Sequence, residues 1–232
     1  MESVLKRTQK PDHAEAVHSA AAAVTPLLSY RQGAIARGSK EVVNREKVVG
    51  GLRMGFENMI VLLGRTPAAL DALLHGLPEV WTETNESGNT WNVRTVIAHL
   101  IQGEHEDWMP RTRHILHFSE AQQFAPFDRD GHVRYGKGKT LTQLLNEFAK
   151  ARAKSLDELR ELKLTTQDFE RRGLHPALGS VCLSELLATW AAHDLTHLHQ
   201  ISRIMAHQLR EAVGPWARFL GVMRCVGHSE AG

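Results

Sequence analysis

The chain has 232 residues, an apolar content of 42% and a formal net charge of +2. This length fits one domain of about 100–200 residues plus an extension, and the apolar content is sufficient for a core without disulfides. The near-balanced charge favours neither nucleic acid nor a membrane surface as a partner, and no apolar run approaches the roughly 18–20 residues of a membrane-spanning helix.

The N-terminal segment, residues 1–53, differs in charge from the rest of the chain. It carries nine Lys and Arg residues against five Asp and Glu residues, a net +4, which leaves −2 for the remainder. Its Ala-rich stretch shows no sustained apolar stripe, and Gly50-Gly51 precedes Met54. We therefore expect a poorly structured or weakly helical extension over residues 1–53, a folded domain over 54–226 and a tail over 227–232. A natural start at Met54 is one alternative, and a targeting segment is the other.

The location of the protein is predicted from what its sequence lacks. The N-terminus has no apolar core followed by a cleavage site, so we expect no signal peptide. The two cysteines, Cys182 and Cys225, have no metal-type spacing and are expected to be free thiols in a reducing compartment. A cytoplasmic location follows as the expectation.

The first two predicted helices follow Met54 in the chain. Thr66-Pro67 resembles an N-cap followed by proline at the first helical position, before a leucine stripe that ends near Pro78. The same helix alternatively extends back to Met54 with a kink at Pro67. A second helix is expected to begin at Asn92 and to end or bend at Pro110.

Two further helices are separated by long loops. Thr140 and Gln143 form a capping box that opens a third helix, which ends near Leu162. The fourth helix covers Leu183 to Met205, and Gly214-Pro215 is expected to terminate it. The connections 119–139 and 165–179 are unusually long, and no segment shows a strand pattern. The expected fold is all-α, a four-helix bundle with long inter-helix loops.

Two histidines lie within the apolar stripe of the fourth helix, LSELLATWAAHDLTHLHQISRIM. With 3.6 residues per turn, His193 and His197 share one face with a largely apolar set, Leu186, Trp190, Gln200, Ile201 and Ile204. A buried polar group without a partner costs about 1–3 kcal/mol. Two imidazoles one turn apart therefore suggest a shared partner, for which a metal ion is a candidate. His199 is expected to face away.

A third histidine, His99, faces inward on the predicted second helix, where Gly103 one turn later leaves space beside it. Metal sites in bundles are built from side chains on facing helices. The His-x-x-x-His spacing alone is a weak signal, because the chain has fourteen histidines. Two interpretations stay open from the residues: a three-histidine metal site, and three histidines whose hydrogen bonds are satisfied in the core.

Several neighbouring side chains are candidates for contacts to the histidines or to a substrate. Trp190 and Gln200 share the histidine stripe, and Asp194 either orients an imidazole or faces solvent. Three arginines could hold an anionic substrate, although an ion pair at the surface is the commoner fate of an arginine: Arg111, Arg129 and Arg152.

Five segments together resemble the DinB superfamily of four-helix-bundle proteins. They are TWNVRTVIAHLIQGE, DWMPR, FAPFDR, RRGLHPALGSVCLSELLATWAAHDLTHLHQI and EAVGPWARFL, in one order between Met54 and Met223. The resemblance implies one divalent metal ion, with zinc or nickel expected, held by three histidines. By motif position these are His99 of A-H-L and His193 and His197 of H-D-x-x-H.

The resemblance also implies an activity. Relatives include metal-dependent transferases that attach a low-molecular-weight thiol to an electrophile, so we expect such a reaction with a small-molecule substrate and a thiol co-substrate. A metal-dependent hydrolase, and a non-catalytic stress protein that binds a metal or ligand, are the alternatives. A homodimer is expected from the resemblance alone.

Overall fold

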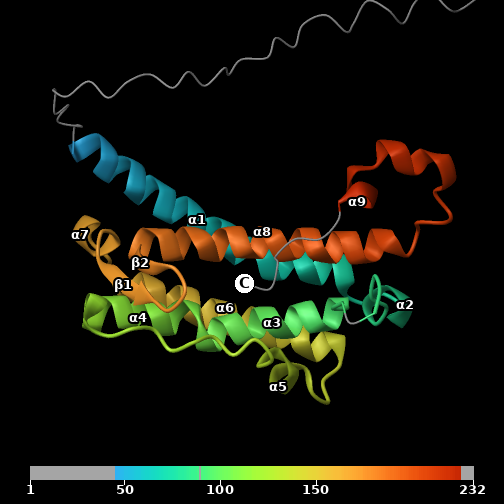
Figure 1. The fold of residues 1–232 in the computed structure, drawn as a ribbon, viewed down its shortest axis with the longest axis horizontal. Coiled ribbons are helices and arrows are strands. Elements are labelled where there is room, and N and C mark those ends of the chain that lie inside the picture. Colours follow the sequence, from blue (N-terminus) through green and yellow to red (C-terminus); the bar gives the residue numbers. More distant parts are fainter. Residues whose placement is uncertain (1–44, 89, 226–232) are drawn as a thin grey trace, which may run out of the picture. The chain divides into compact units, whose positions relative to one another are not determined.

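The computed structural model describes residues 45–88 and 90–225, and side chains from residue 55 onward. Four long helices form a bundle, as predicted (Figure 1): α1 (Arg45–Leu74), α3 (Val93–Glu106) continued by α4 (Trp108–Phe118), α6 (Leu141–Glu161) and α8 (Leu183–His207). None of the described helices combines the length and apolar character needed to cross a membrane. The predicted extension lies largely outside the described residues, and so does the predicted tail.

Helix α1 runs from Arg45 to Leu74 and contains Pro67 without ending there. The prediction of a helix start at Thr66 is wrong. The helix extends back through Met54, as the alternative predicted, and continues to Arg45. The Thr66 hydroxyl, which is buried, donates a hydrogen bond to Asp194 of α8 at 2.5 Å instead of capping a helix. The predicted domain boundary at residue 54 falls inside α1.

Short helix α2, Glu79–Thr82, leads to α3, Val93–Glu106. The predicted cap is confirmed, because the Asn92 side chain accepts a hydrogen bond from the Thr95 backbone N–H at 2.9 Å. The break falls at Asp107, before α4, Trp108–Phe118. Pro110 explains this position, since a proline ring clashes with the carbonyl four residues earlier and is tolerated in a first helical turn.

The long loop after α4 is partly structured. It contains the 3₁₀-helix η1, Ser119–Ala121, and the short helix α5, His132–Gly136. Helix α6, Leu141–Glu161, follows with the predicted capping box between Thr140 and Gln143.

The loop after α6 corrects the expectation that no segment is a strand. After α7, Thr166–Phe169, strands β1, Arg172–His175, and β2, Gly179–Cys182, pair antiparallel as a hairpin with Arg172 opposite Cys182. Each strand has only four residues, which is too short for a period-two pattern to emerge.

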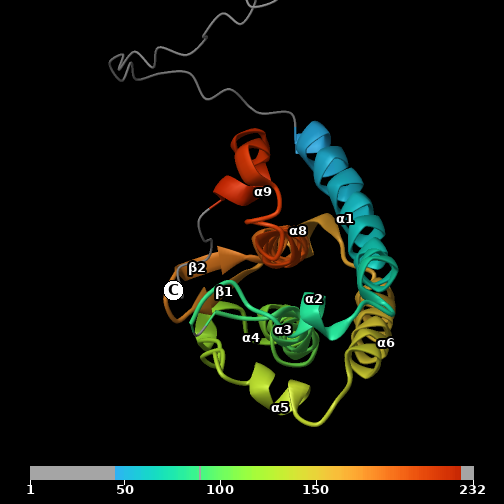
Figure 2. The same ribbon diagram turned by 90° about the vertical axis from the view of Figure 1, so that its right-hand side faces the viewer.

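Helix α8, Leu183–His207, ends before Gly214, the predicted terminator. Turns lead to the 3₁₀-helix η2, Gly214–Phe219, and then to α9, Gly221–Arg224. Helices α1 and α3 each pack against both α6 and α8, so they occupy opposite corners of the bundle (Figure 2).

The bundle core consists of two apolar clusters at successive levels along the helices. One contains Phe56, Leu63, Trp108 and Trp190, and the other contains buried residues such as Leu70, Ile101, Phe148, Ile201 and Ile204. Between the two levels each long helix contributes a buried polar residue to one network, which we call the polar layer: Thr66, Glu104, Arg152 and Asp194.

The polar layer is an internally paired ion network. The Arg152 guanidinium donates to Glu104 Oε1 at 2.7 and 3.0 Å and to Asp194 at 2.6 and 2.9 Å. All three charged side chains are only 1% exposed. Burial acts to lower the pKa of Arg152, but its bonds to Asp194 and Glu104 outweigh burial and raise the pKa above its ordinary value.

Candidate metal centre

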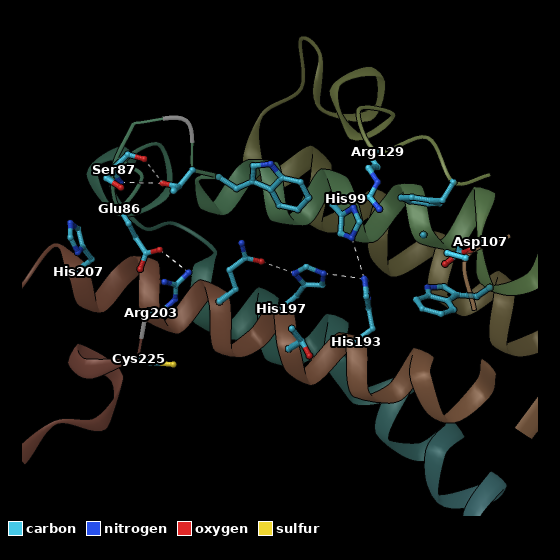
Figure 3. Close-up of a pocket in the computed structure, with 18 of the residues that line it drawn as sticks. Glu86, Ser87, His99, Asp107, Arg129, His193, His197, Arg203, His207 and Cys225 are labelled. Atoms are coloured by element: carbon cyan, nitrogen blue, oxygen red, sulfur yellow. Dashed lines mark hydrogen bonds and ion pairs between the residues drawn. The ribbon is translucent and has the colours of Figure 1, made fainter. Parts of the chain in front are cut away.

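Three imidazoles converge beside the polar layer. The Nε2 atom of His193 lies 3.1 Å from His99 Nε2 and 3.0 Å from His197 Nε2 (Figure 3). Helix α3 supplies His99, and α8 supplies His193 and His197 one turn apart. Among the described residues these three form the group of potential metal ligands, with ligand atoms within 4.8 Å of one another. We call them the histidine cluster.

Gln200 determines how the His197 ring is oriented. Its side-chain Oε1 accepts a hydrogen bond from His197 Nδ1 at 2.7 Å. Because an amide oxygen only accepts, the proton of neutral His197 lies on Nδ1 and the Nε2 lone pair points toward the other two rings. Such a contact to the outer nitrogen is typical of a metal-ligating histidine.

The surroundings keep two of the histidines neutral. Burial, with a further contribution from neighbouring His197, lowers the pKa of His99 to about 3 and that of His193 to about 2. A metal ion binds only the neutral imidazole. At neutral pH His99 and His193 are therefore in the protonation state that a metal ligand needs.

The cluster also has unsatisfied polar atoms. The Nδ1 atoms of His99 and His193 are buried and have no hydrogen-bond partner in the described part of the chain. A single proton on His193 Nε2 cannot be donated to both neighbouring Nε2 atoms, and neutral His197 carries its proton on Nδ1. At least one of the two Nε2–Nε2 contacts therefore has no proton between its nitrogen atoms. A divalent cation fits this arrangement, because tetrahedral zinc about 2.0–2.1 Å from each nitrogen sets imidazole nitrogens about 3.4 Å apart.

The histidine cluster opens onto a cavity of about 1290 Å³. Aromatic rings close much of its wall beside the cluster: Trp91 lies 5.0 Å from His99, Trp108 lies 5.0 Å from His193, and Phe127 lies 5.9 Å from His99, between ring centroids. The C-terminal residues Met223 and Cys225 also line it. The cavity is large enough for a small-molecule substrate beside a metal ion.

Charged side chains line the cavity on both sides of the cluster. Arg111 pairs with Asp107 at 2.7 Å, and Arg203 pairs with Glu86 at 2.7 Å. Burial raises the pKa of the Asp107 carboxyl although Arg111 opposes this. Arg129 is exposed and extends toward the histidines in Figure 3, and its guanidinium has no carboxylate partner among the described residues.

The structure brings together some of the residues singled out in the sequence and separates others. Gln200, Arg111 and Arg129 line the cavity with the histidine cluster. Trp190, Asp194 and Arg152 instead belong to the interior: Trp190 is fully buried, and Asp194 bonds Arg152 and Thr66 rather than an imidazole or solvent. His199 is exposed, away from the cluster.

Several cavity residues carried no signal in the sequence. Trp91, Trp108, Phe127 and His175 line the cavity. Trp91 and Trp108 lie near the ends of a predicted helix, Phe127 lies within the predicted loop 119–139, and His175 ends the unpredicted strand β1. Their positions depend on how loops fold over the bundle, which helical periodicity does not describe.

The sequence profile of the DinB superfamily matches residues 62–201, a span that includes all three histidines. The chain belongs to the DinB superfamily. A solved structure of YfiT from Bacillus subtilis is similar to this DinB fold with a TM-score of 0.56 at 19% sequence identity, covering 76% of this chain and 94% of that chain. YfiT is described as a probable metal-dependent hydrolase with an unusual four-helix bundle topology. No curated protein sequence matches the chain.

Proposed function

We propose that His99, His193 and His197 hold one divalent metal ion and that the protein uses it to transfer a low-molecular-weight thiol to an electrophile. The observation that carries the proposal is the convergence of three Nε2 atoms, at 3.0 and 3.1 Å, on the wall of a large cavity. Three histidines with no carboxylate among them leave open positions on a metal ion.

A divalent ion held there would lower the pKa of a bound thiol and favour its nucleophilic form. Side chains around the histidine cluster are suited to the activation of a thiol. Gln200 fixes the donor atom of His197, while Trp91 and Phe127 place aromatic rings against His99. Arg129, which points into the cavity without an acidic partner, is suited to a carboxylate of the thiol or of the electrophile.

A metal-dependent hydrolase is the second candidate, and Asp107 favours it. Its carboxyl lines the same cavity, and burial raises its pKa, which makes the carboxylate a stronger base toward a water molecule. The description of YfiT as a probable metal-dependent hydrolase points the same way.

Metal binding is tested first, by elemental analysis after loading with zinc or nickel. We expect about one ion per chain for the wild type and His199→Ala, and less than a few tenths for His193→Ala, with unchanged helical circular dichroism in all three. Wild-type protein without metal, or equal metal content in His193→Ala, would contradict the site.

The two reactions are then distinguished with cobalt-loaded protein. Glutathione, cysteine, bacillithiol and mycothiol are titrated in turn, and a thiolate-to-cobalt charge-transfer band is expected with at least one of them. No band with any thiol would contradict the transferase and favour the hydrolase, for which Asp107→Asn should then abolish ester hydrolysis.

The remaining expectations stay predictions. A cytoplasmic location, a homodimer and a poorly structured or weakly helical extension before α1 have support from the sequence only. A chain that starts at residue 45, where α1 begins, should keep the stability of the full-length protein.

A further inference from the structure

Two stacked tryptophans, of which only Trp108 lines the cavity, differ in how their indole N–H groups are used. Trp108 of α4 and Trp190 of α8 stack with ring centroids 5.8 Å apart and planes 11° apart. They are 4% and 0% exposed. The Trp190 Nε1–H donates to Glu104 Oε1 at 3.1 Å. No described residue accepts a hydrogen bond from the Trp108 Nε1–H, and this nitrogen is not fully buried although the residue as a whole is, so the donor is accessible from the cavity that Trp108 lines.

The Trp108 indole lies next to the histidine cluster. Its ring centroid is 5.0 Å from that of His193, with the planes at 70°, and Trp108 lines the cavity. Gly103, one turn after His99 on α3, lines the cavity too. A Cβ atom at position 103 would lie 3.0 Å from Trp108 Nε1, so the N–H edge packs over bare glycine backbone.

We infer that the Trp108 Nε1–H donates a hydrogen bond to the ligand that occupies the histidine cluster. An indole N–H only donates, so the ligand carries an acceptor oxygen at this position, as a carboxylate, carbonyl or hydroxamate does. The inference rests on the proposed metal site and adds a source of specificity, because a ligand without an acceptor here would cover the Trp108 N–H without bonding it and leave the donor unpaired. Trp108 is thus a substrate-binding residue, and Gly103 keeps its donor uncovered.

Nuclear magnetic resonance of the full-length, zinc-loaded chain observes this hydrogen bond directly. The chain has five tryptophans and hence five indole N–H signals, which Trp108→Phe and Trp190→Phe assign by deletion. Acetate, acetohydroxamate and mercaptoacetate serve as probes. We expect the Trp108 signal to move downfield on saturation, while the Trp190 signal, already bonded to Glu104, stays in place. A stationary Trp108 signal with all three probes would overturn the inference.

Probe affinity gives an independent measurement, from the visible spectrum of cobalt-loaded protein. Trp108→Phe keeps the ring and its stacking, so it should bind one metal ion but bind acetate about 2- to 10-fold more weakly, the effect of one hydrogen bond. Gly103→Ala should weaken acetate similarly with Trp108 intact, because the new methyl group meets Nε1.

Trp190→Phe is the matched control, since it removes the stacked partner's N–H without touching the cavity, and it should keep wild-type affinity for acetate. Equal affinity in wild type and Trp108→Phe, or equal losses in both tryptophan variants, would overturn the hydrogen bond while leaving the metal site intact. Failure of the wild type to take up metal would overturn both proposals.

Discussion

The polar layer and the histidine cluster lie side by side in the same bundle yet are opposite in character. Glu104 and Asp194 of the layer share helices α3 and α8 with the cluster, and Asp194 directly follows His193. The layer pairs one cation with two carboxylates through four hydrogen bonds of 2.6–3.0 Å. The cluster instead gathers nitrogen atoms with two unpartnered Nδ1 atoms and no counter-charge. The layer forms its ion pairs within the chain, with Glu104 Oε2 its one oxygen that lacks a partner among the described residues, whereas we expect the cluster to be completed by a bound cation.

The largest expected effect comes from breaking the layer. Arg152→Met leaves the Glu104 and Asp194 carboxylates buried without a cation, which should lower the free energy of unfolding by about 3–5 kcal/mol. Urea denaturation in the presence of a chelator measures this. Arg160→Ala is the control, because its pair with Asp157 is exposed and should contribute less than about 1 kcal/mol. Similar midpoints for the two variants would show that the layer is not needed for stability.

Metal binding should raise the free energy of unfolding through the histidine cluster and not through the polar layer. Free zinc at a thousand times its dissociation constant should raise the free energy of unfolding by about 4 kcal/mol, through binding to the folded state alone. Thermal melts with and without a chelator should show this increase in wild type and Arg160→Ala but not in His193→Ala. An equal increase in His193→Ala would place the bound zinc elsewhere.

The metal-free protein should lose stability in acid because of the cluster. The pKa values of His99 and His193 are lowered from 6.5 in the unfolded chain to about 3 and about 2 in the folded protein, chiefly by burial. The unfolded state therefore binds more protons between these values, so this stability is fully present above pH 6.5 and falls as the pH drops toward 3.

Each histidine contributes a slope of up to about 1.4 kcal/mol per pH unit in that range. Chelator-treated protein unfolded in urea at a series of pH values measures the slope, and His193→Leu should reduce it by about one proton. An unchanged slope would mean that His193 is protonated in the folded state.

The smallest expected effect concerns the contact that orients His197. Gln200→Ala removes the acceptor for Nδ1–H and should weaken zinc binding about 10-fold without changing the stability of the metal-free protein much. Competition with a chromophoric chelator gives the affinity. His199→Ala, an exposed change on the same helix, should bind zinc as the wild type does, and equal affinity in Gln200→Ala would exclude an orienting role.

Helical periodicity was sufficient to place the histidines on inward faces of two helices, and local capping motifs located the starts of α3 and α6 at Asn92 and Thr140. These features depend on residues within one or two turns of each other. The partners of Arg152 could not be predicted this way, because Glu104 and Asp194 are 48 and 42 positions distant along the chain. Which turn of one helix faces which turn of another is a property of the packed bundle.

The difference between Trp108 and Trp190 has the same origin. Both are buried aromatic residues at helical positions, and the sequence drew attention to Trp190 because it shares the histidine stripe. Trp108, and not Trp190, lines the cavity. The break between α3 and α4 before Pro110 redirects the chain and brings the Trp108 ring beside His193. A break of this kind changes which face is inward and interrupts the periodic pattern.

The polar layer also fixes the axial register of the helices. A shift of α8 by one turn would move it about 5.4 Å along its axis and separate Asp194 from both Arg152 and Thr66, whereas the contacts in the apolar clusters on either side are not directional. Since His193 adjoins Asp194 and His99 lies on the helix that carries Glu104, the same ion pairs align the three imidazoles. The network sets the spacing of the nitrogen atoms without touching them.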